Sequence, residues 1–222
     1  MKKGLVVVGI LSFLLAGCST TGSSAKETDP EVQEISVCLP AELTTLDTTQ
    51  TTDKVTFTVI QHLFEGSYRF DEKSQPVPGL AEEAVISEDG KTYTFKLKEE
   101  AKWSDGQQVQ AADFAYAWKK LVDPKTMGPN AYLLDNVVNS QDIREGKADI
   151  ATIGLETPDE KTFVVHLEQL QPSFLSVVSI GWLAPQRQSY VEEKGKAYGK
   201  TSEDLLYTGP FILKDWQQTG AE

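Results

Sequence analysis

The sequence predicts a mixed fold, of the α/β or α+β class, in which helices pack on mixed sheets. Short runs of alternating apolar residues, such as Tyr93, Phe95 and Leu97, predict strands with one buried face. Other runs repeat apolar residues every three or four positions, as Val55, Val59 and Leu63 do, and this spacing predicts helices. The composition is 40% hydrophobic and 24% charged over 222 residues, which is typical of a globular chain. Because the two patterns alternate irregularly and no internal repeat is present, we expect mixed rather than uniformly parallel sheets.

The N-terminus predicts export. Lys2 and Lys3 precede an apolar run of the length found in secretory signals, and Leu15-Ala16-Gly17-Cys18 follows that run. This last segment looks like a bacterial lipobox, in which the cysteine is lipidated after cleavage. We therefore expect a signal peptide over residues 1–17 and a lipid anchor at Cys18. The alternative is an ordinary signal peptide in which the cysteine stands by chance.

The next segment predicts a tether followed by a strand. Residues 18–34 contain mostly small, hydroxyl and charged side chains, so they cannot bury a core and are expected to form a flexible tether. Ile35, Val37 and Leu39 alternate, which predicts a strand that stops at Pro40. Within this strand, Cys38 is expected to be a small buried thiol.

The remaining elements follow from the same two periods and from turn signals. Residues 44–53, rich in Thr and Asp, are expected to form a loop. Tight turns are predicted at Pro78-Gly79, Asp89-Gly90 and Trp103-Ser104-Asp105-Gly106. The predicted helices are Lys54 to Gly66, Ala111 to Val122, Asp142 to Lys147, Pro172 to Ser179 and Ser189 to Gly195; the predicted strands are Tyr68 to Phe70, Val85 to Ser87, Tyr93 to Leu97, Thr162 to Leu167 and Phe211 to Leu213.

Charge and side-chain chemistry exclude several function classes. The formal net charge of −12 argues against nucleic acid, whose phosphates require clustered Lys and Arg, and against electrostatic docking on anionic lipid. Two scattered histidines, His62 and His166, offer little for a metal site, and we predict neither metal nor cofactor. No nucleophile elbow, phosphate loop or dinucleotide fingerprint is present. The sequence therefore predicts a protein that is not an enzyme.

A series of motifs resembles one known family. The motifs are Gly79-Leu80-Ala81-Glu82-Glu83, Ser87-Glu88-Asp89-Gly90-Lys91-Thr92-Tyr93-Thr94-Phe95-Lys96-Leu97-Lys98, Ala101-Lys102-Trp103-Ser104-Asp105-Gly106, Asp113-Phe114, and Thr208-Gly209-Pro210-Phe211-Ile212-Leu213-Lys214-Asp215-Trp216. Together they resemble the signature of the oligopeptide and dipeptide family of extracytoplasmic solute-binding proteins, which feed ABC importers. The resemblance implies a periplasmic-binding-protein-like fold of type II. Residues 35–65 and 187–222 would form part of lobe I, and residues 66–186 a small inserted α+β domain. These motifs are expected to be mostly scaffold.

The resemblance also implies a function. It indicates a lipid-anchored protein that captures oligopeptides, including peptide pheromones, and delivers them to the membrane permease of an ABC importer. Such a protein would face the extracellular or periplasmic side of the cell membrane. Two alternatives stay open: a binder of another solute (nickel chelate, haem or oligosaccharide), and a truncated surface lipoprotein without ligand binding. Relatives run to more than twice this length, so we expect the chain alone not to close a normal cleft.

The resemblance places the candidate ligand-binding residues in three segments. Thr51, Thr52, Asp53 and Lys54 form the first segment, Asn130 and Tyr132 the second, and Trp182 the third. For Asp53 a role as N-cap of the following helix is equally expected, and for Trp182 a place in the core. Gln110 stands where the family commonly has a Thr N-cap, which predicts a helix start weaker by about 1 kcal/mol.

Overall fold

The computed structural model describes residues 34–216, so the predicted signal peptide and Cys18 lie outside the described residues. The chain divides into two units, Met1–Cys38 and Leu39–Glu222. In the first unit, the described residues 34–38 form neither helix nor strand, and Ile35 and Val37 are 67% and 71% exposed. The predicted strand from Ile35 to Leu39 is therefore wrong, and so is the buried thiol, because Cys38 is exposed. Alternation alone does not make a strand, which needs a hydrogen-bonded neighbour to cover its apolar face.

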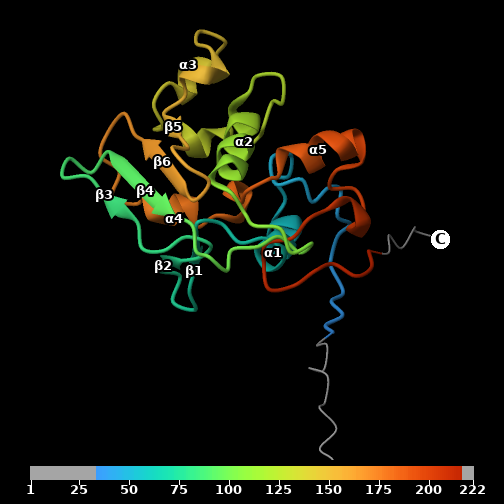
Figure 1. The fold of residues 1–222 in the computed structure, drawn as a ribbon. Coiled ribbons are helices and arrows are strands. Elements are labelled where there is room, and N and C mark those ends of the chain that lie inside the picture. Colours follow the sequence, from blue (N-terminus) through green and yellow to red (C-terminus); the bar gives the residue numbers. More distant parts are fainter. Residues whose placement is uncertain (1–33, 217–222) are drawn as a thin grey trace, which may run out of the picture. The chain divides into compact units, whose positions relative to one another are not determined.

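In the second unit, the strands form two antiparallel sheets (Figure 1). The four-stranded sheet has the order β3-β4-β6-β5, with β3 at Val85–Ile86, β4 at Thr92–Lys96, β5 at Leu155–Glu156 and β6 at Thr162–His166. β1 (Tyr68–Phe70) pairs with β2 (Pro76–Pro78) in a separate ribbon. The predicted strands at 68, 85, 93 and 162 are confirmed to within two residues at each end. Gly90 has φ +68°, as the predicted Asp89-Gly90 turn requires.

The apolar face of the four-stranded sheet packs against α2 (Ala111–Val122), whose predicted bounds are confirmed. Phe163 lies at the centre, with its ring 5.0 Å from Trp118 and 5.6 Å from Phe114. Near the start of α2, the Asp113 carboxylate accepts hydrogen bonds from the Trp103 indole and from the backbone N–H of Gln110. The Trp103 turn is therefore part of the scaffold. Gln110 at the N-cap was expected to weaken the start of α2, and Asp113 supports that start by accepting the Gln110 N–H.

The other helices are short. They are α1 (Lys54–Leu63), η1 (Ala131–Leu134), α3 (Ser140–Arg144), η2 (Ile150–Thr152), α4 (Phe174–Val178), η3 (Gly181–Leu183), α5 (Gln188–Lys194), η4 (Gly195–Ala197) and η5 (Ser202–Asp204). The helix predicted from Asp142 to Lys147 starts two residues earlier, and Gly146 follows it with φ +72°. The strand predicted at Phe211 to Leu213 is wrong. This segment lies along the end of α1, where Phe211 donates one backbone hydrogen bond to the His62 carbonyl.

The buried apolar residues fall into two clusters. The first, the sheet cluster, contains the sheet, α2 and α4 and includes Trp118 and Phe163. The second, the α1 cluster, includes Leu46, Ile60 and Tyr198. The division of the chain at residues 66 and 186 into a partial lobe and a small domain stays a prediction.

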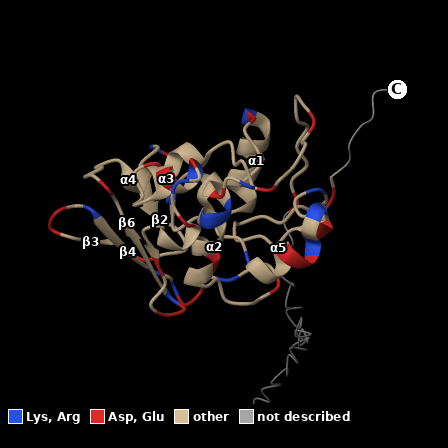
Figure 2. Ribbon diagram, turned by 90° about the horizontal axis from the view of Figure 1, so that it is seen from above, with Lys and Arg blue, Asp and Glu red and all other residues tan. Residues whose placement is uncertain are grey.

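Acidic and basic residues both occur on α5 (Figure 2). None of the helices in the described region is long and apolar enough to cross a membrane.

Candidate functional site

The first candidate segment belongs to a loop that is polar yet largely buried, residues 44–53, called here the polar loop. Thr48, Thr49 and Thr51 are each at most 2% exposed. Buried hydroxyl groups require hydrogen-bond partners. Thr49 meets this requirement within the loop, because both its backbone N–H (3.0 Å) and its hydroxyl (2.7 Å) donate to Asp47 Oδ1.

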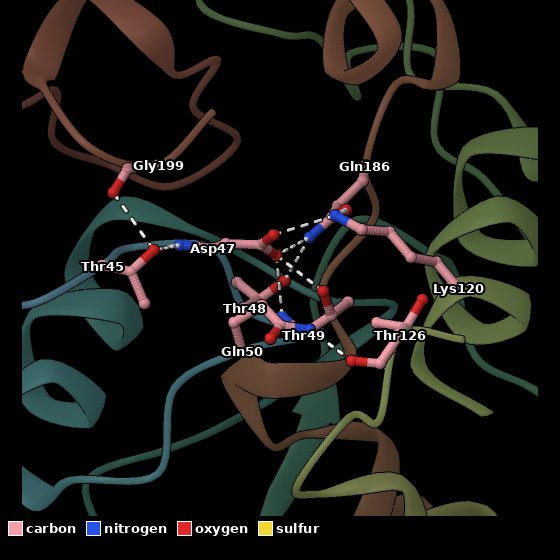
Figure 3. A network of polar contacts seen from close by, with 9 residues as sticks. All are labelled: Thr45, Asp47, Thr48, Thr49, Gln50, Lys120, Thr126, Gln186 and Gly199. Atoms are coloured by element: carbon pink, nitrogen blue, oxygen red, sulfur yellow. Dashed lines mark hydrogen bonds and ion pairs between the residues drawn. The ribbon is translucent and has the colours of Figure 1, made fainter. Parts of the chain in front are cut away.

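Asp47 connects the polar loop to two distant segments (Figure 3). Lys120 Nζ of α2 lies 2.9 Å from Asp47 Oδ2, and Gln186 Nε2 donates to Asp47 Oδ1 at 2.9 Å. Gln186 also donates to the Thr48 hydroxyl at 2.8 Å and accepts from Lys120 at 3.0 Å. The Asp47 and Lys120 side chains are only 11% and 19% exposed, so solvent screens this ion pair weakly. Lys120 Nζ also lies 5.1 Å from the centre of the Tyr198 ring.

Tyr198 lines the same region. Its burial, together with the nearby Asp47 carboxylate, raises the pKa of Tyr198 well above the usual tyrosine value. The phenol therefore stays neutral at physiological pH, and Lys120 is the cation that balances Asp47.

A second set of contacts holds the end of the polar loop. Asn130 Nδ2 donates to the Thr51 carbonyl at 2.7 Å, and Gln50 Nε2 donates to the Thr126 carbonyl at 3.2 Å. Asn130 is 3% exposed. The structure thus brings two predicted site residues, Thr51 and Asn130, into direct contact although 79 positions separate them. Both residues are buried, and the Asn130 amide nitrogen and the Thr51 carbonyl are engaged with each other.

Asp53 is the N-cap of α1, since its Oδ1 accepts from the Thr56 backbone N–H at 2.8 Å. The capping alternative is therefore confirmed, whereas no contact tests the ligand role. Slight burial acts to raise the pKa of Asp53, but hydrogen bonds from Thr56 and Thr51 together hold it below the usual value. Thr52 and Lys54 are exposed beside it.

The two aromatic candidates lie in different surroundings. Tyr132 of η1 is 55% exposed. Trp182 of η3 is half-buried, and its ring centre lies 4.7 Å from that of Phe57 in α1. The Trp182 indole N–H is buried without a hydrogen-bond partner among the described residues. Trp182 thus belongs partly to the core, as its alternative interpretation predicts.

Lys120 and Gln186 were not among the sequence-predicted site residues. Lys120 follows the buried Ala117 by three positions on α2, so both lie on the same side of that helix, and a lysine at such a position is the one signal for a buried partner. Gln186 carries no such signal.

In the described region, no group of three or more His, Cys, Asp and Glu side chains is placed to hold a metal ion. A small cavity of about 270 Å³ lies beside η1, lined by residues that include Leu121, Met127 and Ala131.

The comparisons with known proteins identify the family. Residues 75–221 match the middle region of the bacterial extracellular solute-binding proteins, family 5. A dipeptide-binding protein of Lactococcus lactis is 36% identical over 208 residues, which covers 94% of this chain and 36% of the relative. A periplasmic oligopeptide-binding protein of Salmonella typhimurium is 33% identical and is covered to 40%. The chain belongs to this family of extracellular solute-binding proteins.

Solved structures agree with this assignment. The substrate-binding domain of an oligopeptide ABC transporter from Bacillus anthracis shares 40% identity, with a TM-score of 0.77 over 79% of this chain and 34% of that one. The pheromone receptor PrgZ shares 35% identity, with a TM-score of 0.78 over 82% of this chain and 36% of that one. The predicted periplasmic-binding-protein-like fold is thereby confirmed, and the chain spans between one third and two fifths of the length of these relatives.

Proposed function

We propose that this protein is the peptide-capturing component of an ABC importer, anchored to the cell membrane by a lipid on Cys18. Relatives named for dipeptide and oligopeptide binding, and one named as a pheromone receptor, support oligopeptides as the ligand. The membrane permease of the importer would be the partner, and no catalytic step is needed. The protein would face the extracellular or periplasmic side.

One observation supports the proposal most: the hydrogen bond from Asn130 to the Thr51 carbonyl brings two predicted ligand-binding segments into contact. Next to this bond, Thr52, Asp53 and Lys54 are exposed and offer a hydroxyl, a carboxylate and an ammonium group. A zwitterionic peptide presents amide groups, an ammonium and a carboxylate, which these groups complement. Each carboxylate oxygen of Asp53 accepts one hydrogen bond from within the chain, from Thr51 or from Thr56, but the side chain is exposed to solvent.

Photo-crosslinking is the direct test, because it also detects weak complexes. The purified chain is irradiated with a pool of short peptides that carry a diazirine side chain, and the labelled residues are located by mass spectrometry. We expect labelling of residues 51–54 that excess unlabelled peptide abolishes and that oligosaccharide, haem and nickel chelates do not. Competition by one of these three solutes, and not by peptide, would support that solute as the ligand instead. Absence of any competed label would favour the surface lipoprotein.

Two further measurements test the remaining expectations. Titration of the chain with peptides should give affinity weaker than micromolar if the chain alone does not close a cleft, and tighter binding would contradict that expectation. The lipid anchor is tested by the mass of the membrane-bound protein and by Cys18→Ala, which should release the protein from the membrane.

A further inference from the structure

Three chain segments meet at one buried polar network, the Asp47 network, formed by Asp47, Thr48, Lys120 and Gln186 (Figure 3). Thr48 is 1% exposed and Gln186 is fully buried. The Gln186 side chain uses both ends of its amide, because Nε2 donates twice and Oε1 accepts from Lys120. Each contact in this network is therefore a directional hydrogen bond, and together the contacts fix the relative positions of the four side chains.

The Asp47 network determines the path of the polar loop. Asp47 Oδ1 holds the backbone N–H of Thr49 at 3.0 Å, while Gln186 holds the Thr48 hydroxyl. Immediately before Asp47, the Leu46 N–H donates to the Gly199 carbonyl at 2.8 Å. The loop is thus fixed at residues 46–49, directly before the segment proposed to face the ligand. An ordered loop avoids the conformational entropy that a mobile loop would lose on binding.

Close packing at Gly199 strengthens this constraint. Gly199 has φ +76°, and a Cβ atom there would lie 2.5 Å from the Asp47 backbone nitrogen. The polar loop therefore cannot shift toward Gly199 and away from Lys120 and Gln186.

We propose that Lys120 and Gln186 are positioning residues for ligand capture, which act through Asp47 and Thr48 to present residues 51–54. This assignment rests on the proposed function, since it concerns the same site. It predicts that breaking the Asp47 network lowers peptide capture at residues 51–54 even in molecules that remain folded.

The test uses Gln186→Leu, with Thr48→Val as a milder variant that removes only the acceptor of one Gln186 hydrogen bond and keeps the side-chain shape. Lys119→Met, which changes the neighbouring lysine of the same helix, is the matched control. Photo-crosslinking with the diazirine peptides is run at a temperature at which circular dichroism shows each protein folded. Gln186→Leu removes two buried hydrogen bonds to charged groups, with Asp47 and Lys120, whereas Thr48→Val removes only a neutral one. We therefore expect competed labelling of residues 51–54 to fall about tenfold in Gln186→Leu and less in Thr48→Val.

Amide hydrogen exchange supplies a readout that general destabilisation would not give. In both variants, exchange should accelerate in residues 46–51 and stay unchanged in β4 and β6. Unchanged labelling of residues 51–54 in the folded variants would overturn the assignment while the proposed function stands. A wild-type chain that peptides do not label would overturn the proposed function, and the positioning role with it.

Discussion

The two apolar clusters differ in the kind of secondary structure that surrounds them. In the sheet cluster, buried residues of β4 and β6 alternate with mostly half-buried positions. Phe95 and Phe163 of these strands and Phe114 of α2 are fully buried. The α1 cluster is built from α1, α5 and irregular segments, and half-buried residues such as Val59 and Phe211 lie against it. The sheet cluster draws most of its buried residues from the stretch between Tyr68 and Leu183, with Leu206 in addition, whereas the α1 cluster joins segments from both ends of the second unit.

This difference concerns where stability is located and where the predicted ligand-binding residues lie. Thr51 to Lys54 and Trp182 lie with the α1 cluster, whereas Asn130 and Tyr132 lie at η1, whose Ala131 and Leu134 belong to the sheet cluster. The Asp47 network joins the two regions, because Asp47 follows Leu46 of the α1 cluster and Lys120 lies on α2. Recognition elements are commonly drawn from the less stable parts of a structure, because they have to adapt to a ligand. Substitutions in the two clusters should accordingly have unequal effects on the free energy of unfolding.

The largest expected effect is that of Phe163→Ala in the sheet cluster. Phe163 is fully buried and contacts three aromatic rings, so its truncation should cost about 3–5 kcal/mol of unfolding free energy. Phe211→Ala is the matched substitution beside the α1 cluster. Because Phe211 is already half-exposed, its truncation should cost about 1–2 kcal/mol. Urea unfolding followed by circular dichroism measures both, and equal losses would contradict the comparison.

The next effect concerns the Asp47 network. Lys120→Met leaves the Asp47 carboxylate mostly buried without its cation, which should cost about 3 kcal/mol. The Lys119→Met control should change the unfolding free energy by about 0.5 kcal/mol or less. Adding Asp47→Asn to Lys120→Met should recover part of the loss, since the unpaired charge is removed while Oδ1 still accepts from Thr49 and Gln186. A double variant less stable than Lys120→Met by the full cost of Asp47→Asn alone would show that the two residues are not coupled.

The contrast between the clusters also explains what the sequence predicts well. The hairpin around Asp89-Gly90 and the bounds of α2 follow from local periodicity and turn chemistry, because their partners are close in the chain. Ile35 to Leu39 and Phe211 to Leu213 show the same alternation, but it predicts strands that the structure lacks. Periodicity reports which face of a segment is apolar, and it carries no information on whether a partner strand is present.

The candidate site shows a similar limit. The resemblance selected Thr51 and Asn130, which the structure joins by a hydrogen bond. It gave no reason to select Gln186, whose three contacts come from segments 66 and about 140 positions away. A buried glutamine has no sequence period, so only the three-dimensional arrangement reveals its partners.

A smaller effect is expected at the N-cap of α1. Asp53→Ala removes the acceptor for the Thr56 N–H and should cost about 1 kcal/mol. The pKa of Asp53 is lowered in the folded protein, so its contribution to stability is present above the ordinary value of 3.8 and is lost as the pH falls through the folded value. Asp53→Asn keeps a capping side chain without the titration. Unfolding curves from pH 7 down to below 3.8 should therefore converge for wild type and Asp53→Asn at the acid end, and a constant gap between the two would contradict the assignment.

The smallest expected effects come from exposed apolar residues, one in each region. Val85 on β3 is 70% exposed and Ile212 beside the α1 cluster is 65% exposed, so neither side chain buries much area. Val85→Thr and Ile212→Thr should each change the unfolding free energy by less than about 0.5 kcal/mol. Thermal unfolding by circular dichroism measures this change, with Phe163→Ala as the large reference. If the two clusters differ only in their buried residues, the two surface substitutions should change the unfolding free energy equally. A loss well above this limit at Ile212 alone would mean that this segment buries its apolar side chain in solution, and that the α1 cluster is more closed than its half-buried margin indicates.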